Sequence, residues 1–399
     1  MPSPAATYRV VILTADRHDD VGPLEAALRE SALVAGNRRT TLDVTTDSGL
    51  LTRPADPADP PTVAVVLGGG PATAHDPGIA AAVAPSRARY VALLPVVSDS
   101  TVFHEQAPEA LHELNGYEWR SGDPAGPLAD AVLRLVGLSE KDRRVFVSYR
   151  RTDATTIAEQ VRRALDDDRW DVFLDRYSIP PAEDVQRRVD LELADKAFVL
   201  LLESPDATTS AWVEHEIAFA LRHRYGLMGL AFPGTPASGL FPALHDAFRR
   251  RLRPDELTGT GHDARLTGPA LQAVLSEIER RHAAATRLRR ESTMVDVSDQ
   301  LHDLGFRVSA ADEWSLLAER GTQREALLVT PRAPLPADLR TADLLRRRHA
   351  GPTGARPRGW VVHPTKDADE ERARLMRWLS RHRAVRSTPV MLLSKRLRG

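Results

Sequence analysis

The sequence predicts an α/β protein built from three consecutive units, each with a parallel sheet covered by helices. Short apolar runs typical of buried strands alternate along the chain with longer amphipathic segments typical of helices. A length of 399 residues suits two or three domains. A polar stretch at 138–144 and the end of a long helical pattern near residue 292 divide the chain, so we expect domains at 1–139, 140–290 and 291–399.

The first unit is predicted to be Rossmann-like. Its expected strands are at 8–14, 41–46, 61–70 and 89–99, and its expected helices at 21–36 and 127–138. Three glycines, Gly68 to Gly70, stand between a strand and a helical pattern, where backbone N–H groups can hold a phosphate. Their spacing meets neither nucleotide-binding fingerprint. We therefore favour a tight turn, with a nucleotide-sensing loop as the alternative.

The second and third units continue the alternation and are predicted to be Rossmann- or flavodoxin-like. In the second unit we expect strands at 143–151, in the first part of 169–184, at 197–204 and at 225–234, and helices at 155–167, 185–196, 213–224 and 267–292. In the third unit we expect strands at 306–310, 324–331, 358–364 and 388–394, and helices at 297–306, 337–348 and 370–383. We find no clear sequence repeat between the units, so each is assigned from its own pattern.

Composition excludes several classes of protein. The hydrophobic content of 42% and charged content of 27% are ordinary for a globular chain, and a formal net charge of -1 gives no general attraction for nucleic acid. The absence of cysteine excludes disulfides and thiolate catalysis, and the histidines lack zinc-site spacing, so no metal is expected. No apolar run reaches the ~18 residues of a membrane span, and the first residues lack a signal layout. We therefore expect a cytoplasmic protein that binds neither membranes nor nucleic acid.

One helix start raises a functional question. The stretch SAWVEHEIAFAL, residues 210–221, places Trp212, Glu214 and Glu216 at the beginning of an apolar helix. Ser210 is a suitable N-cap, and acidic residues early in a helix suit its positive end, so both carboxylates could simply stabilise the helix. The alternative is that one of them works in an active site.

Three segments of the second unit together resemble a Toll/interleukin-1 receptor (TIR) domain. RRVFVSYRR at 143–151 is similar to the first-strand motif of that family, and DVFLDRYSIPPAED at 171–184 to its second strand and following loop. AFVLLLES at 197–204, with the helix start after it, resembles the fourth strand and the Trp-x-x-x-Glu helix of TIR domains. The segments occur in family order and cover roughly 140–288. The whole layout is also similar to bacterial TIR proteins that carry an additional N-terminal α/β unit.

The resemblance implies a function as well as a fold. Many TIR domains cleave NAD⁺ and others only bind partner TIR domains; in the enzymes the glutamate four residues after the tryptophan is catalytic, which here is Glu216. The resemblance thus implies hydrolysis or cyclisation of NAD⁺, with NAD⁺ as substrate and no cofactor, in an effector of bacterial defence against phage. It also implies self-association through TIR domains, with flanking units that receive a nucleotide or protein trigger. A non-catalytic TIR adaptor and a nucleoside deoxyribosyltransferase-like enzyme remain alternatives.

The predicted site suits cleavage of the bond between nicotinamide and ribose. Nicotinamide leaves a cationic pyridinium as a neutral molecule, so no general acid is needed, whereas a carboxylate stabilises the positive charge that develops on the ribose. Ligands of open α/β sheets lie beyond the carboxyl ends of the strands. The residues expected to bind substrate there are Ser148, Tyr149, Arg150, Arg151, Asp175, Asp184 and Trp212. Trp212 would supply an aromatic wall, and the two arginines suit the diphosphate.

Overall fold

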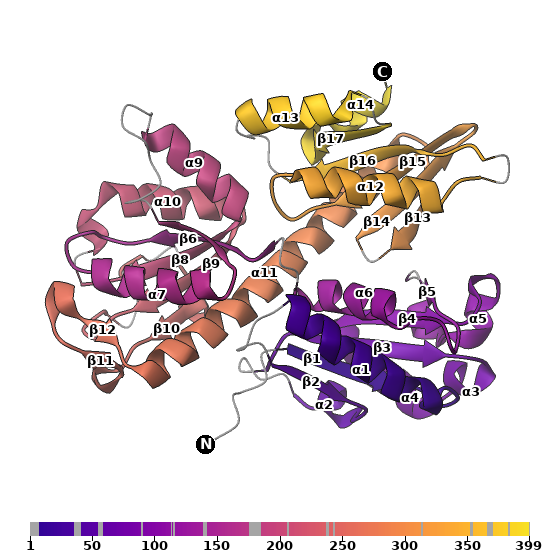
Figure 1. Cartoon of the computed structure of the whole chain (residues 1–399), viewed down its shortest axis with the longest axis horizontal. Helices are drawn as coiled ribbons and strands as arrows, with labels where there is room; N and C mark the ends of the chain where they lie inside the picture. The colour runs from indigo at the N-terminus through magenta and orange to yellow at the C-terminus, as the bar shows by residue number, and fades with distance from the viewer. Residues whose placement is uncertain are drawn as a thin grey trace.

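Three five-stranded sheets, flanked by helices, follow one another along the chain (Figure 1). The computed structural model describes residues 8–35, 41–54, 59–88, 91–112, 114, 116–138, 142–174, 185–205, 207–236, 239–241, 244–312, 314–351, 354–364, 370–381 and 384–398. The predicted fold class, α/β units in series, is confirmed, because the first two sheets are parallel throughout.

The first unit is a doubly wound parallel sheet. Its strands are β1 (Tyr8–Leu13), β2 (Leu42–Thr45), β3 (Thr62–Gly68), β4 (Ala92–Val97) and β5 (Tyr117–Glu118), in the order β2-β1-β3-β4-β5. Its helices are α1 (His18–Ala35), α2 (Gly49–Thr52), α3 (Pro71–Ala74), α4 (Pro77–Ala88), η1 (Ser100–Val102), α5 (Phe103–Gln106), η2 (Glu109–Leu111) and α6 (Gly126–Val136). Alternate residues of β1 face opposite cores: Val10 packs with α1 and α6, whereas Val11 packs with α2 and α4.

Close packing accounts for the first glycine of the turn after β3. A Cβ atom on Gly68 would lie 1.9 Å from the backbone carbonyl oxygen of Gln106, so only glycine lets α5 approach the strand end. The next glycine, Gly69, donates its backbone N–H to the Asp16 carboxylate at 3.0 Å. These contacts join the ends of β1 and β3.

The second unit has the same strand order as the first. Its strands are β6 (Arg144–Ser148), β7 (Asp171–Leu174), β8 (Phe198–Glu203), β9 (Gly226–Ala231) and β10 (Arg249–Arg251), in the order β10-β9-β8-β6-β7, with a small antiparallel ribbon of β11 (Leu257–Thr258) and β12 (Arg265–Leu266). Its helices are α7 (Thr155–Asp167), α9 (Val185–Lys196), η4 (Ala207–Thr209), α10 (Ala211–Arg222), η5 (Asp246–Phe248), η6 (Pro254–Glu256), η7 (Gly261–Asp263) and α11 (Gly268–Asp303). Helices α7 and α11 pack on one face of the sheet, and α9 and α10 on the other.

The third unit differs from the prediction in several places, one of which is a strand at Ser315–Arg320 that we did not expect. Its strands are β13 (Arg307–Asp312), β14 (Ser315–Arg320), β15 (Gln323–Val329), β16 (Arg358–His363) and β17 (Val385–Pro389), and its helices are α12 (Pro336–Arg348), α13 (Glu370–Ser380), η8 (Val390–Leu392) and α14 (Leu393–Arg398). The expected parallel sheet is correct for β15 to β17 but wrong for β13 to β15, which form an antiparallel meander. The expected strand at 388–394 is also wrong beyond Pro389, because proline cannot donate to the sheet and the chain turns helical there.

Helix α11 is one continuous helix of 36 residues that runs between the three units (Figure 1). We expected two helices, 267–292 and 297–306, but the sequence between them contains no glycine or proline to end the first. Val274 and Ile278 of α11 lie in the core of the second unit, Ala283 in that of the first, and Val297 and Leu301 in that of the third. Residues 290 and 291, the predicted domain boundary, therefore lie inside a helix that all three units share.

A buried charged cluster also joins the units around α11. Arg290 of α11 donates to the Asp142 carboxylate at 2.7 Å, and Arg332 of the third unit lies 3.0 Å from the same carboxylate. Burial by itself lowers the pKa of Arg332, but Asp142 and Asp338 outweigh burial and raise it. Trp314, next to β14, packs in the first unit's core with the Arg290 guanidinium 5.3 Å from the centre of its ring. The contact region between the units is thus both apolar and ion-paired.

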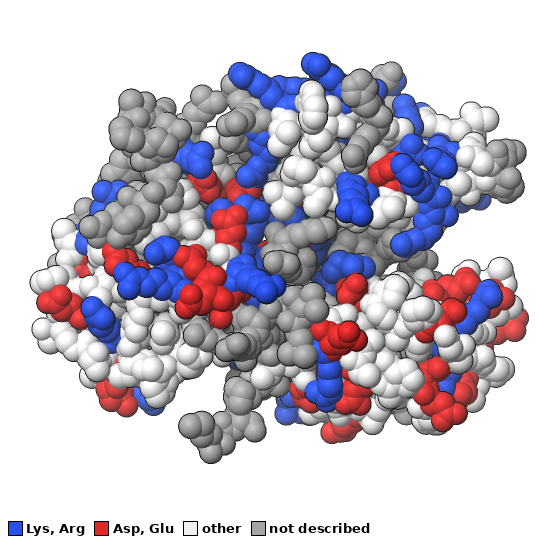
Figure 2. All heavy atoms as spheres, in the orientation of Figure 1, with Lys and Arg blue, Asp and Glu red and all other residues white. Residues whose placement is uncertain are grey.

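Charged side chains are unevenly distributed over the face shown in Figure 2. Basic side chains gather over the third unit, at the upper right, and acidic side chains are frequent over the first unit, at the lower right. In the arginine cluster of α12, Arg346 and Arg347 pair with Asp343 of the same helix at 3.1 and 2.8 Å. One carboxylate therefore offsets only part of the positive charge of these arginines.

Candidate active site

The carboxyl edge of the central sheet brings the predicted site segments together. In its strand order, the first strand β6 lies beside the third strand β8, and the ligand crevice of such a sheet opens beyond these two strands. Strand β6 ends at Ser148, which pairs with Leu201 of β8. Strand β8 then leads through η4 to α10, so the loop after β6 and the start of α10 lie on one rim.

The two glutamates at the start of α10 have different environments. Ser210 caps the helix as predicted, since its hydroxyl accepts a hydrogen bond from the backbone N–H of Val213 at 3.5 Å. Glu214 is exposed, whereas Glu216 is buried, with 4% of its surface exposed. Val213 and Ile217 face the core, and at about 100° per residue the two glutamates flank their common direction on opposite sides, so burial is what distinguishes Glu216. Only Glu216 is therefore directed into the protein.

The loop between β6 and α7 supplies buried polar groups and two arginines. Ser148 and Tyr149 are buried, and no described residue hydrogen-bonds to the Ser148 hydroxyl, although buried hydroxyls normally have a partner. Arg150 lies 3.6 Å from Asp153, which fixes it near the start of α7. Arg151 is exposed, and its backbone carbonyl accepts a hydrogen bond from the Thr155 hydroxyl at 2.5 Å. Among the described residues, the Ser148 hydroxyl and the Asp153 carboxylate of this loop thus have unused hydrogen-bonding capacity.

Three predicted site residues are described incompletely or not at all. Asp175 and Asp184 lie outside the described residues, in the segment between β7 and α9. Trp212 occupies the second position of α10, one turn before Glu216, and only its backbone is described. Their roles in a site remain predictions.

Sequence reasoning missed an ion pair at the same edge of the sheet. Glu203, the last residue of β8, is fully buried, and both its carboxylate oxygens accept from Nε of Arg249 at 3.0 and 2.9 Å. Arg249 also donates to the Phe241 carbonyl at 2.7 Å. In the sequence, Glu203 stands out as an acid at the end of an otherwise apolar strand. Its partner Arg249 is 46 residues away, so the sequence does not indicate the pair. Because both oxygens of Glu203 are occupied, its carboxylate serves structure.

The surroundings of α10 are polar without forming a metal centre. His215 lies 2.9 Å from Asp190 of α9, which ties the two helices together. Across the described residues, no group of three or more His, Cys, Asp or Glu side chains is arranged to hold a metal ion. Likewise, none of the helices in the described ranges is long and apolar enough to cross a membrane.

Comparison with known proteins identifies the central unit. Residues 145–252 match the family model described as TIR domain, and these residues contain β6 to β10, the loop after β6 and α10. The chain is therefore a TIR-domain protein, with the TIR domain in its central unit. A search of curated proteins found no match. A solved structure assigned as a phosphosugar isomerase from Silicibacter pomeroyi DSS-3 matches 72% of this chain and 87% of its own, with 13% identity and a TM-score of 0.21.

Proposed function

We propose that this TIR-domain protein is an NAD⁺ nucleosidase, with Glu216 as its catalytic carboxylate. The bond between the ribose and the nicotinamide nitrogen breaks, and its electron pair leaves with nicotinamide. A water molecule then gives ADP-ribose, or the adenine ring of the same molecule closes a cyclic ADP-ribose. NAD⁺ is the substrate, and the chemistry needs no further cofactor.

In this proposal each predicted residue has a physical role. The Glu216 carboxylate stabilises the positive charge that develops on the ribose and accepts hydrogen bonds from the ribose hydroxyls. Ser148 and Tyr149 line the crevice beyond β6, with Asp175 and Asp184 in the segment after β7. Arg150 and Arg151 bind the diphosphate, and Trp212 lies against the cationic nicotinamide ring.

The contrast between Glu214 and Glu216 is the observation that supports the proposal best. An acidic side chain in the first turns of a helix gains about 0.3–1 kcal/mol from the helix dipole while staying in solvent, as Glu214 does. Burial of a carboxylate costs more than that gain unless other groups compensate for it. The burial of Glu216, which Glu214 does not share, therefore goes beyond what the helix dipole requires and supports Glu216 as the acid of the proposed site.

The test is an assay of NAD⁺ cleavage by the full chain, with and without a crowding agent that promotes self-association. Nicotinamide and the second product are separated by liquid chromatography. Glu216→Gln keeps the size of the side chain and removes its charge, so we expect a loss of about 10²-fold or more, as for removal of one electrostatic stabiliser. Glu214→Gln, two residues earlier and exposed, is the matched control and should stay within about twofold of the unmodified chain.

Three results would contradict the proposal. Equal activity of Glu216→Gln and Glu214→Gln would remove Glu216 from the chemistry. Intact NAD⁺ under conditions where self-association is demonstrated would favour the adaptor interpretation. Exchange of free bases on nucleosides, without cleavage of NAD⁺, would identify a deoxyribosyltransferase-like enzyme instead.

The proposed activity suits a cytoplasmic effector of bacterial defence against phage, since loss of NAD⁺ stops growth of the infected cell. Association between TIR domains would switch the enzyme on. The first and third units would receive the trigger, a nucleotide or a protein. Their shared contacts with α11 give a physical route from either unit to the TIR domain.

A further inference from the structure

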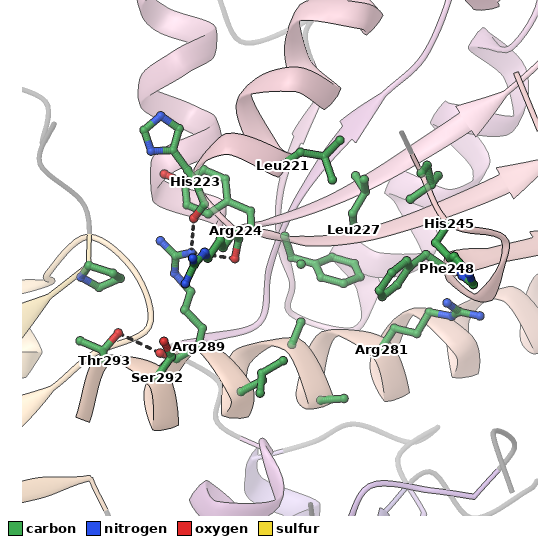
Figure 3. Close-up of a pocket in the computed structure, with 18 of the residues that line it drawn as sticks. Leu221, His223, Arg224, Leu227, His245, Phe248, Arg281, Arg289, Ser292 and Thr293 are labelled. Atoms are coloured by element: carbon green, nitrogen blue, oxygen red, sulfur yellow. Dashed lines mark hydrogen bonds between the residues drawn. The ribbon is translucent and has the colours of Figure 1, made fainter. Parts of the chain in front are cut away.

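A cavity of about 750 Å³ lies at the amino edge of the central sheet, opposite the proposed active site (Figure 3). Phe198 at the start of β8 and Gly226 at the start of β9 contribute to its lining, as do residues of α11 from Arg281 to Asp296. Pro364 and Val390 of the third unit complete the lining. The volume falls in the range of small-molecule sites, about 300–1,000 Å³, and such sites often occur between domains.

The lining of this cavity is mainly apolar. Leu221, Phe248 and Leu288 are among the large apolar side chains that stay exposed, at 39%, 50% and 58%. Exposed apolar side chains that gather around one hollow indicate a ligand site more strongly than the same residues scattered singly. Ala284 and Ala285, between Arg281 and Arg289 on α11, contribute short side chains to the lining.

One cation of the lining has no carboxylate partner. The Arg289 guanidinium donates to the backbone carbonyls of Pro331, His223 and Arg224 at 2.7, 2.7 and 2.9 Å, and it lies 4.5 Å from the centre of the Tyr225 ring. Its Nη2 has no hydrogen-bond partner among the described residues. Burial lowers the pKa of Arg289 to about 10.

The other charged groups of the lining do not neutralise Arg289. Asp296 also lines the cavity but forms no ion pair with Arg289. Arg281, eight residues earlier and thus about 12 Å away along the helix, already pairs with Glu277. An anion bound beside Arg289 would therefore pair with a positive charge at one end of an apolar hollow.

We propose that this cavity binds an organic anion with an apolar body of aromatic-ring size. The body lies against Leu221, Phe248 and Leu288, and the anionic group accepts hydrogen bonds from Arg289. The ligand would contact α10, α11 and the third unit at once. Because Leu221 belongs to the same helix as Glu216, five residues further on, the site lies where occupancy can reach the proposed catalytic helix.

The test uses two fluorescent probes that share one apolar body. 8-Anilinonaphthalene-1-sulfonate carries an anionic group, and N-phenyl-1-naphthylamine lacks it. Full-length protein should bind the sulfonate saturably, with one site per chain. Arg289→Gln should weaken the sulfonate by about tenfold or more and the neutral probe by less than twofold. Arg287→Gln, on the same helix and outside the lining, is the matched control and should change neither.

A second variant keeps the test decisive if Arg289→Gln unfolds. Ala284 is exposed to the cavity, so Ala284→Phe fills the space while retaining the arginine, and it should abolish binding of both probes. Absence of saturable binding to the unmodified chain would overturn the proposal. So would equal weakening of both probes by Arg289→Gln, or unchanged binding in Ala284→Phe. Since NAD⁺ cleavage is not the readout, this test can fail or succeed independently of the proposed enzyme activity.

Discussion

Replacing Asp142 tests whether the buried charged cluster holds the three units together. Asp142 is 4% exposed and lies 2.7 Å from Arg290 and 3.0 Å from Arg332. Asp142→Asn keeps the shape and removes the charge, which leaves two buried guanidinium groups without this carboxylate. Breaking a buried ion pair costs about 3–5 kcal/mol. Because Arg332 keeps Asp338 at 2.9 Å, we expect the lower end of this range, about 3 kcal/mol.

The effect can be measured by urea unfolding, followed by tryptophan fluorescence and circular dichroism. With a slope of about 3 kcal/mol/M, a loss of about 3 kcal/mol lowers the unfolding midpoint by roughly 1 M urea. Asp246→Asn is the control, because its pair with Arg251 is at the surface, where ion pairs contribute little to stability. Equal midpoints for the two variants would refute the reasoning.

Two further predictions concern the contacts of α11. Burial lowers the pKa of His282 from 6.5 to about 4, so the unfolded state binds more protons between these values; stability should therefore fall by roughly 3 kcal/mol as the pH drops through this window. His282→Gln should lose that component of the pH dependence, and an unchanged dependence would contradict the assignment. Gly137 has a φ of +94°, and a Cβ there would lie 2.7 Å from Cβ and 2.9 Å from Cα of Ala283. Gly122 has a φ of +89° with open space around it. Gly122→Ala should lower the free energy of unfolding by about 1 kcal/mol through backbone strain alone. Gly137→Ala should lower it by about 1–3 kcal/mol more, because its Cβ clashes with α11. Thermal unfolding measures both, and equal losses would show that α11 moves aside without cost.

The parts of the fold that sequence predicts well are those with local causes. Apolar runs predicted four of the five strands in each of the first two sheets but not the edge strands β5 and β10, and Ser210 predicted the helix cap. These features depend on side chains a few residues apart.

The parts that the sequence did not reveal depend on distant segments. The direction of pairing in β13 and β14 is not encoded in their hydrophobicity, because a parallel and an antiparallel neighbour bury the same side chains. The pair of Glu203 and Arg249 joins residues 46 apart. The cavity beside Arg289 exists only because two units meet on one helix, so no single stretch of sequence indicates it.

The continuity of α11 has a consequence for how the length of this protein can vary. A helix of 36 residues is about 54 Å long, and each added residue rotates everything beyond it by about 100° and moves it by 1.5 Å. One residue inserted between Ile278 and Val297 would leave every sheet intact but turn the third unit away from the TIR domain and from Asp142. The number of residues in α11 thus determines the orientation of one unit relative to the next. Insertions in this helix should therefore be tolerated far less than insertions in the loops of any one unit.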